Sequence, residues 1–252
     1  MKRIAAALTF FTRIPIWKWT EITQRYYSSV VVYWPLTGWV TGGFTALLLW
    51  FAAQVFPMLA AVVIALTGRT LLTGALHEDG LADFCDGFGG GTTKERILAI
   101  MKDSHIGTYG VIGLIFYYLW LVSIVVSIPL EIATTGVFAS DAFAKACAAQ
   151  LVNFLPYSRP EGAKNKISYD RMTIAQSLIV ILTGLLPVCL LAYIDIFMAM
   201  SIIAPIIVIS MLTLYMRHKI GGYTGDCCGA SCLLCELSML AAVAMIYNVQ
   251  IL

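Results

Sequence analysis

Residues 109–128 read YGVIGLIFYYLWLVSIVVSI, a run of twenty residues without a charged side chain. A helix that crosses the hydrocarbon core of a bilayer needs about 20 predominantly apolar residues. This stretch meets the requirement on both length and composition. It therefore predicts a membrane-spanning helix, and the rest of the chain can be judged against that expectation.

The composition of the chain favours lipid as its main solvent. Of the 252 residues, 60% are hydrophobic and 12% are charged, whereas a soluble domain carries about 25% charged residues. Too few polar side chains remain to cover a water-facing surface. We expect one all-α integral-membrane domain over residues 1–252. The seven cysteines are odd in number and several lie in apolar runs, so a disulfide framework is not expected. Because the first apolar stretch begins late, near Val30, we expect no removable signal peptide.

Seven segments are apolar and long enough to span a bilayer. They cover residues 30–51, 57–76, 109–128, 132–155, 174–193, 196–216 and 230–252. If the N-terminus lies inside, every Lys and Arg except Arg69 and Lys145 falls in the inner segments 1–29, 77–108, 156–173 and 217–229. Basic residues accumulate on the cytoplasmic side of membrane proteins. The pattern predicts seven spans with the N-terminus inside and the C-terminus outside. A peripheral fourth segment would reverse the later orientations and spoil the charge asymmetry.

Residues 2–19 precede the first span and carry a different pattern. Apolar residues recur there at helical spacing, at Ile4, Leu8, Phe11 and Ile14, and basic residues and two tryptophans accompany them. This combination is typical of an amphipathic helix that lies in the membrane interface.

Residues 77–91 read HEDGLADFCDGFGGG and carry the most informative polar pattern. Asp79, Asp83 and Asp86 are spaced i, i+4 and i+7, so they share one face of a helix. Three carboxylates on one face repel one another unless a cation lies among them, and hard oxygen ligands favour Mg²⁺, Mn²⁺ or Ca²⁺. The glycines from Gly87 onward are expected to end the helix and to let the backbone approach phosphate oxygens. The alternative is a solvated acidic loop at the membrane surface.

Further polar residues flank the apolar segments. Lys102, Asp103 and His105 precede the third span, where they either contact phosphate and metal or anchor the start of a helix, with Asp103 or Ser104 as the N-cap. Asp226 lies at the inner mouth of the last span. It either supplies another carboxylate or a base, or favours the helix dipole as an N-terminal residue.

For the remaining candidate site residues, a structural role is weighed against a functional one. Arg13 and Arg159 are phosphate clamps or ordinary positive-inside anchors. His77 borders the acidic face and either contacts the substrate phosphate or is an isolated histidine without a functional role. Within the spans, Asp141 and Lys145 at i, i+4 are expected to pair, and Glu236 is a functional acid or the partner of a buried base. Cys228, Cys232 and Cys235 share a helical face, for which core packing is preferred to a soft-metal site.

At these motifs the chain resembles the cobalamin synthase family, also called adenosylcobinamide-GDP ribazoletransferases. The matching stretches are LTFFTRIP from Leu8, WPLTG from Trp34, TGALHEDGLADFCDG from Thr73, IMKDSHIGTYG from Ile100, YSRPEG from Tyr157 and GYTGDCCGA from Gly222. They follow the family order and extend over nearly the whole chain. The family usually has Arg where His105 stands and often has Arg near Asp141, and the pair Cys227-Cys228 is unusual.

The resemblance implies a Mg²⁺-dependent enzyme of the bacterial or archaeal inner membrane with a cytoplasmic active site. It implies that adenosylcobinamide-GDP and α-ribazole, or α-ribazole 5′-phosphate, give adenosylcobalamin, or its phosphate, and GMP. The expected partners are these small molecules and the lipid bilayer, without nucleic acid. A second copy of the chain and other cobalamin-assembly enzymes are left open as partners.

The expected mechanism places charge neutralisation above covalent chemistry. One or two Mg²⁺ ions would be held by Asp79, Asp83 and Asp86. The proton of the attacking hydroxyl would pass to Asp226 or Asp103, and the remaining phosphate charge would be offset by Lys102, Arg13 and Arg159. The alternatives are a CDP-alcohol phosphotransferase-like membrane enzyme, whose Ala-Arg pair after the second Asp-Gly is missing here, and a cation transporter.

Overall fold

The computed structural model describes residues 2–159 and 169–251, and within these ranges it contains helices and no β-strand. The first part of the chain forms α1 (Lys2–Phe11), η1 (Ile16–Lys18), η2 (Gln24–Tyr33), α2 (Trp34–Ala53), α3 (Met58–Thr73), α4 (Leu76–Gly90), α5 (Lys94–Ile100) and α6 (Thr108–Val126). The second part forms α7 (Leu130–Ala149), α8 (Leu151–Phe154), α9 (Ile174–Leu185), α10 (Val188–Ile194), η3 (Ile196–Ile202), α11 (Ile203–Ile220) and α12 (Gly225–Ile251). Here η denotes a 3₁₀-helix.

All seven apolar segments of the sequence are helical. Within the described ranges, five helical stretches are long and apolar enough to cross a membrane: Tyr26–Ala53, Thr108–Val126, Ile174–Ile194, Ile196–Ile220 and Gly225–Gln250. A sixth span is possible by length if α3 and α4, which are bent by 90° at their junction, are taken together. The all-α polytopic membrane fold is therefore confirmed, whereas the number of crossings and their orientation stay predictions.

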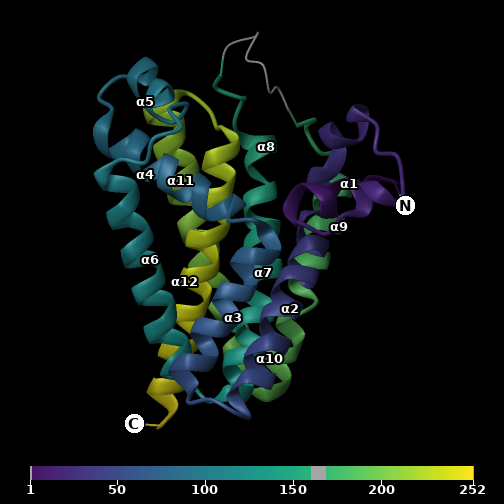
Figure 1. Ribbon diagram of the computed structural model, residues 1–252, viewed down its shortest axis with the longest axis vertical. Helices are drawn as coiled ribbons and strands as arrows, with labels where there is room; N and C mark the ends of the chain where they lie inside the picture. Colours follow the sequence, from purple (N-terminus) through teal and green to yellow (C-terminus); the bar gives the residue numbers. More distant parts are fainter. Residues whose placement is uncertain (1, 160–168, 252) are drawn as a thin grey trace.

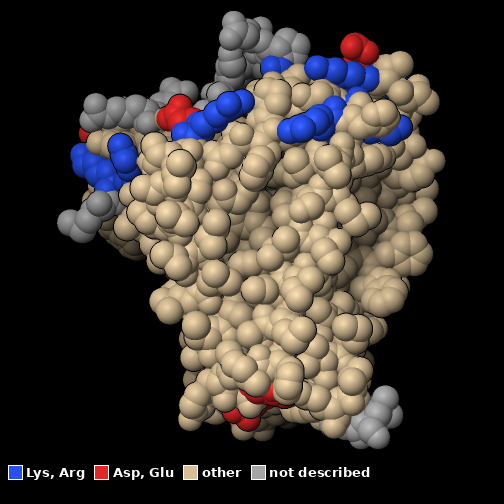
Figure 2. Space-filling view, turned by 180° about the vertical axis from the view of Figure 1, so that it is seen from behind, with Lys and Arg blue, Asp and Glu red and all other residues tan. Residues whose placement is uncertain are grey.

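The charges lie at the ends of the bundle. Figure 2 shows Lys and Arg gathered at one end, a broad uncharged belt below them, and only acidic side chains at the other end of that face. The first helix, α1, lies near the basic end of the bundle, and α12 ends at the C-terminus at the opposite end (Figure 1). This arrangement agrees with the charge asymmetry of the sequence. Lys164 and Lys166, two of the inner basic residues, lie outside the described residues.

The helix that the sequence made the weakest span, α7, lies at the centre of the packing. It contacts α2, α9, α10, α11 and α12, and nearly all of its side chains from Ala139 onward are buried. Small residues allow the neighbouring backbones to approach: a Cβ added to Gly38 of α2 would lie 2.7 Å from the Cα of Ala142. Asp141 and Lys145 made this segment less apolar than the other predicted spans. Both side chains are buried against neighbouring helices, so they do not face lipid.

A sharp turn between α3 and α4 sets the geometry of the end of the bundle. Gly74 has φ +66° and Ala75 has φ +58°, so two consecutive residues adopt the left-handed conformation. Glycine is the residue that adopts it without strain, and the guanidinium of Arg13 occupies the space that a Cβ on Gly74 would need. As a result α4 turns by 90° from α3 and packs on α12, α6 and α5, near the basic end of the bundle (Figure 1).

Candidate active site at the junction of α4 and α12

The α4 helix and the start of α12 are in close contact. A Cβ added to Gly80 would lie 3.0 Å from the carbonyl oxygen of Asp226 and 3.3 Å from the Cα of Gly229. The two backbones can approach this closely only because both helices have glycine at the crossing. This contact brings Asp226, which is distant in sequence, beside the acidic face of α4.

Negative charge is crowded around Asp83, which is half-buried on α4. Burial raises the pKa of its carboxyl to about 7; the carboxylates of Asp226 and Asp79 add to the rise, and Arg159 opposes it. The neighbours that act most strongly on Asp83 are therefore one residue from α12 and one from its own helix, one turn earlier. A cation placed among these carboxylates would relieve their repulsion.

Asp86 has a different environment from the one that the sequence predicted. One of its carboxylate oxygens accepts a hydrogen bond from the amide of Gly107 at 2.6 Å, and the other accepts one from Gly110 at 2.8 Å. Asp86 is thus a cap for the first turn of α6, supplied by another helix. Neither Asp103 nor Ser104 is the N-cap, because α6 begins at Thr108 with Gly107 before it.

The described carboxylates do not form a complete cation site by themselves. Across residues 2–159 and 169–251, no group of three or more His, Cys, Asp or Glu side chains is arranged to hold a metal ion. The expectation that Asp79, Asp83 and Asp86 together hold a metal ion therefore stays a prediction. Asp79 is exposed and Asp83 is half-buried, and both interact electrostatically with Asp226, whereas the carboxylate of Asp86 accepts from amides at the start of α6.

Replacing Asp86 by Ala is expected to lower the free energy of unfolding by about 1–3 kcal/mol, because the buried amide of Gly110 and that of Gly107 lose their acceptor. Unfolding in detergent micelles, followed by circular dichroism, measures this loss. Asp86→Asn keeps one carbonyl acceptor and should lose less. If both variants unfold like the original chain, Asp86 does not stabilise α6.

Arg159 lies at the junction, where the sequence placed a phosphate clamp or an anchor. Its guanidinium donates to the carboxylate of Asp226 at 2.6 Å and contacts the carbonyl oxygen of Met101 at 3.4 Å. The segment before it is held by a bridge between Tyr157 and Tyr223. The positive charge of Arg159 therefore lies among the carboxylates of the junction.

Several predicted site residues lie elsewhere or are covered. Lys102, Asp103 and His105 are exposed on the loop between α5 and α6, and His105 hydrogen-bonds Asp103 at 2.6 Å and lowers the pKa of that carboxyl. No contact found among the described residues joins these three to the carboxylates of α4 or to Asp226. They are not assembled with the junction in this structure.

The helix α4 ends within the glycine cluster, as predicted, at Gly90 with Gly91 as its C-cap, whereas Gly87 lies inside the helix. Gly87 is buried, and a Cβ there would lie 2.6 Å from Met101. Gly87 therefore packs α4 against the chain that follows α5 and is not part of a flexible backbone, and its contact with phosphate stays a prediction. Arg13 contacts the α3–α4 turn at Gly74, and His77 is buried with its ring 5.3 Å from that of Phe11.

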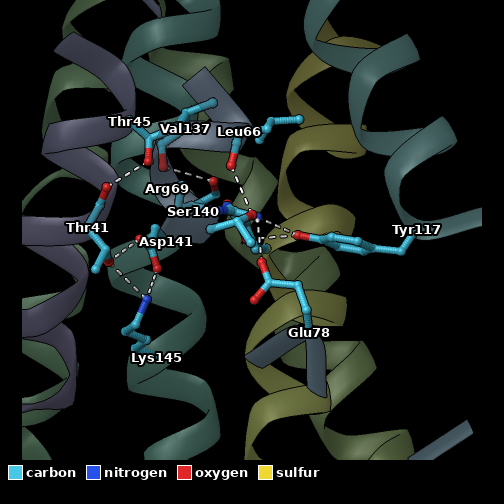
Figure 3. Close-up of polar contacts among 12 residues, drawn as sticks. Thr41, Thr45, Leu66, Arg69, Glu78, Tyr117, Val137, Ser140, Asp141 and Lys145 are labelled. Carbon is cyan, nitrogen blue, oxygen red and sulfur yellow. Dashed lines mark hydrogen bonds and ion pairs between the residues drawn. The ribbon is translucent and has the colours of Figure 1, made fainter. Parts of the chain in front are cut away.

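A buried ionic network lies inside the bundle, where Arg69, Glu78 and Tyr117 point toward one another (Figure 3). Arg69 of α3 donates to Glu236 of α12 at 2.5 Å and to the hydroxyl of Tyr117 at 2.9 Å, and it lies 4.0 Å from Glu78 of α4. The acid Glu236 is thus the partner of a buried base, one of the two roles weighed for it. In the sequence, this network was indicated only by the presence of charged residues such as Arg69 and Glu236 within apolar segments.

A second buried pair adjoins the first. Lys145 pairs with Asp141, as the i, i+4 spacing predicted, and Thr41 of α2 donates to the same carboxylate at 2.5 Å. Cys228, Cys232 and Cys235 are buried and free, in agreement with core packing.

The comparisons with known proteins agree with one another. A family model described as cobalamin-5-phosphate synthase matches residues 3–244. A relative from Leptothrix cholodnii, named adenosylcobinamide-GDP ribazoletransferase, is 36% identical over 241 residues, which cover 92% of this chain and 90% of the relative. A relative of the same name from Shewanella baltica is 33% identical over 248 residues, which cover 96% and 94% of the two chains. No solved structure matches the chain.

Proposed function

Because the chain belongs to the cobalamin-5-phosphate synthase family, we propose that it is a membrane transferase that joins adenosylcobinamide-GDP to α-ribazole or α-ribazole 5′-phosphate. The products are adenosylcobalamin, or its phosphate, and GMP. The observation that carries this function is the match of the family and of named relatives over nearly the entire chain, including both helices of the α4–α12 junction.

We further propose Mg²⁺ as the cofactor. Mg²⁺ is usually held by one or two carboxylates together with substrate phosphates, and the junction offers Asp79 and Asp83 one turn apart with no third protein ligand in place. Burial raises the pKa of Asp83 to about 7 and the carboxylates of Asp226 and Asp79 add to the rise, and a cation at this place would oppose both effects. When bound, the ion would neutralise pyrophosphate oxygens and stabilise the GMP that leaves.

The remaining roles follow from the placement of the side chains. Arg159 would bind phosphate oxygens, since its guanidinium already lies among the carboxylates. Of the two candidate bases, Asp226 lies at the junction and Asp103 lies on an exposed loop, so we assign proton acceptance from the attacking ribose hydroxyl to Asp226. Asp79 and Asp83 hold the cofactor, and Asp86 keeps the start of α6 in position behind them.

We place the active site on the cytoplasmic side of the cell's inner membrane. The gathering of Lys and Arg at the end of the bundle that carries the junction supports this orientation. Association with a second copy or with other cobalamin-assembly enzymes stays a prediction.

The test uses the purified chain in lipid nanodiscs with adenosylcobinamide-GDP, α-ribazole and Mg²⁺. GMP and a cobalamin product should form together, and EDTA should abolish both until Mg²⁺ is restored. A cytidine-activated alcohol donor should release no CMP. Turnover that is unaffected by EDTA would contradict the metal proposal, and CMP release would favour the CDP-alcohol alternative.

A further inference from the structure

A cavity of ≈ 170 Å³ borders the junction of α4 and α12. Phe10 and Phe11 of α1, Trp34 of α2 and Tyr169 line it together with residues of α4 and α12. Asp79 and Asp226 belong to the same lining. A drug-sized ligand occupies roughly 300–1,000 Å³, so this cavity suits one ring system of a larger substrate, next to the carboxylates of the proposed site.

Part of the cavity wall consists of aromatic rings that pack against one another. The ring of Trp34 lies 5.5 Å from that of Phe11 at 70° and 5.2 Å from that of Tyr169 at 90°. The ring of His77 continues the series, 5.3 Å from Phe11. Edge-to-face contacts of this kind are favourable, and Phe11 and Trp34 are almost completely buried. The slot is therefore formed by packed side chains before any ligand enters it.

Two ring nitrogens in this lining have no partner. The Nε1 of Trp34 and the Nε2 of His77 are both buried and form no hydrogen bond within the described part of the chain. The indole N–H can only donate. Buried polar groups in folded proteins are almost always hydrogen-bonded, so an unpaired donor beside a cavity indicates a missing acceptor.

We propose that this cavity binds the benzimidazole base of α-ribazole, with the indole N–H of Trp34 donating to the free ring nitrogen of that base. This assignment rests on the proposed function and adds to it the place of the acceptor. The base of α-ribazole is a flat bicycle with two methyl groups and one free acceptor nitrogen, which matches aromatic walls with one obligate donor.

The other two ring systems of the reaction fit less well. The corrin macrocycle is far larger than the cavity. Guanine carries donors and acceptors along two edges, and the apolar part of the lining, formed by Phe10, Phe11, Trp34 and two cysteines, would leave unpaired those that the polar lining residues do not reach. A base seated in the slot also brings its ribose toward Asp79 and Asp226, where the hydroxyl must react.

The experiment compares two acceptors on three forms of the full chain in nanodiscs. The acceptors are α-ribazole and its indole analogue, in which CH replaces the free ring nitrogen. The forms are the original chain, Trp34→Phe, and the control Trp39→Phe, whose tryptophan lies on the same helix but donates to the carbonyl oxygen of Thr183 at 3.0 Å. Steady-state kinetics are measured for acceptor and donor, and acceptor binding alone is measured by calorimetry.

The original chain and Trp39→Phe should prefer α-ribazole over the indole analogue by about tenfold, the effect of one neutral hydrogen bond. Trp34→Phe should lose about tenfold in acceptor affinity and treat the two acceptors alike, with an unchanged KM for adenosylcobinamide-GDP. Equal discrimination in Trp34→Phe and the original chain would overturn the proposal. So would a rise confined to the KM for adenosylcobinamide-GDP, which would place the donor nucleotide in the cavity.

A second variant covers the case in which Trp34→Phe is unstable. Gly225 lines the cavity, and a Cβ added there meets no atom within 4 Å. Gly225→Leu should therefore fold normally and reduce calorimetric binding of α-ribazole, and unchanged binding would overturn the proposal. This titration needs no adenosylcobinamide-GDP, so it tests the cavity independently of the reaction. Absence of GMP release from the original chain would count against the proposed function instead.

Discussion

Replacing Asp83 by Asn is expected to lower GMP release by roughly a hundredfold to a thousandfold, the effect of removing one group that stabilises developing charge. Burial, together with the charge of Asp226 and Asp79, raises the pKa of Asp83 to about 7. The same change should raise the melting temperature of the metal-free protein, because it removes one charge from the cluster. Single-turnover kinetics and thermal unfolding in EDTA measure the two effects.

Glu95→Gln is the matched control, since Glu95 is an exposed acid in the first turn of α5. It should change neither quantity. In the original chain, Mg²⁺ should raise the melting temperature by binding the folded state, and Asp83→Asn should weaken this response. Turnover of Asp83→Asn at the original rate and ordinary Mg²⁺ would refute the assignment of Asp83.

Replacing Arg69 by Ala is expected to lower the free energy of unfolding by about 3–5 kcal/mol, because it leaves buried acids without their cation. Arg69 lies 2.5 Å from Glu236 and 4.0 Å from Glu78, and all three side chains are almost completely buried. Unfolding in mixed micelles measures the loss. Activity should fall with it, because Glu78 ties the inner face of α4 to this network while the outer face carries Asp79 and Asp83.

The double variant Arg69→Met with Glu236→Leu tests the cause. Replacing both members of a buried ion pair by apolar residues is often neutral, so the double variant should be more stable than Arg69→Ala. The control Arg96→Ala removes an exposed arginine from α5 and should have little effect. If the double variant is less stable than Arg69→Ala, the pair itself and not the unpaired charge carries the stability.

The sequence by itself determined the all-α membrane fold, the distribution of basic residues and the helical face that carries Asp79 and Asp83. These features depend on hydropathy and on the helical period, which act over neighbouring residues. The pairing of Asp141 with Lys145 was predictable for the same reason, because both lie one turn apart on one helix.

Only the tertiary structure decided which distant groups meet. Asp86 was expected to join Asp79 and Asp83, but the amides of Gly107 and Gly110, more than 20 positions away in the chain, hold its carboxylate. Gly87 lies within α4 and packs against Met101. Asp226, and not Asp103, lies beside the acidic face of α4. Helical spacing shows which residues share a stripe, whereas the partner of each side chain depends on where other helices cross. Here that crossing is set by the 90° turn after α3 and by the glycines that let α4 and α12 touch.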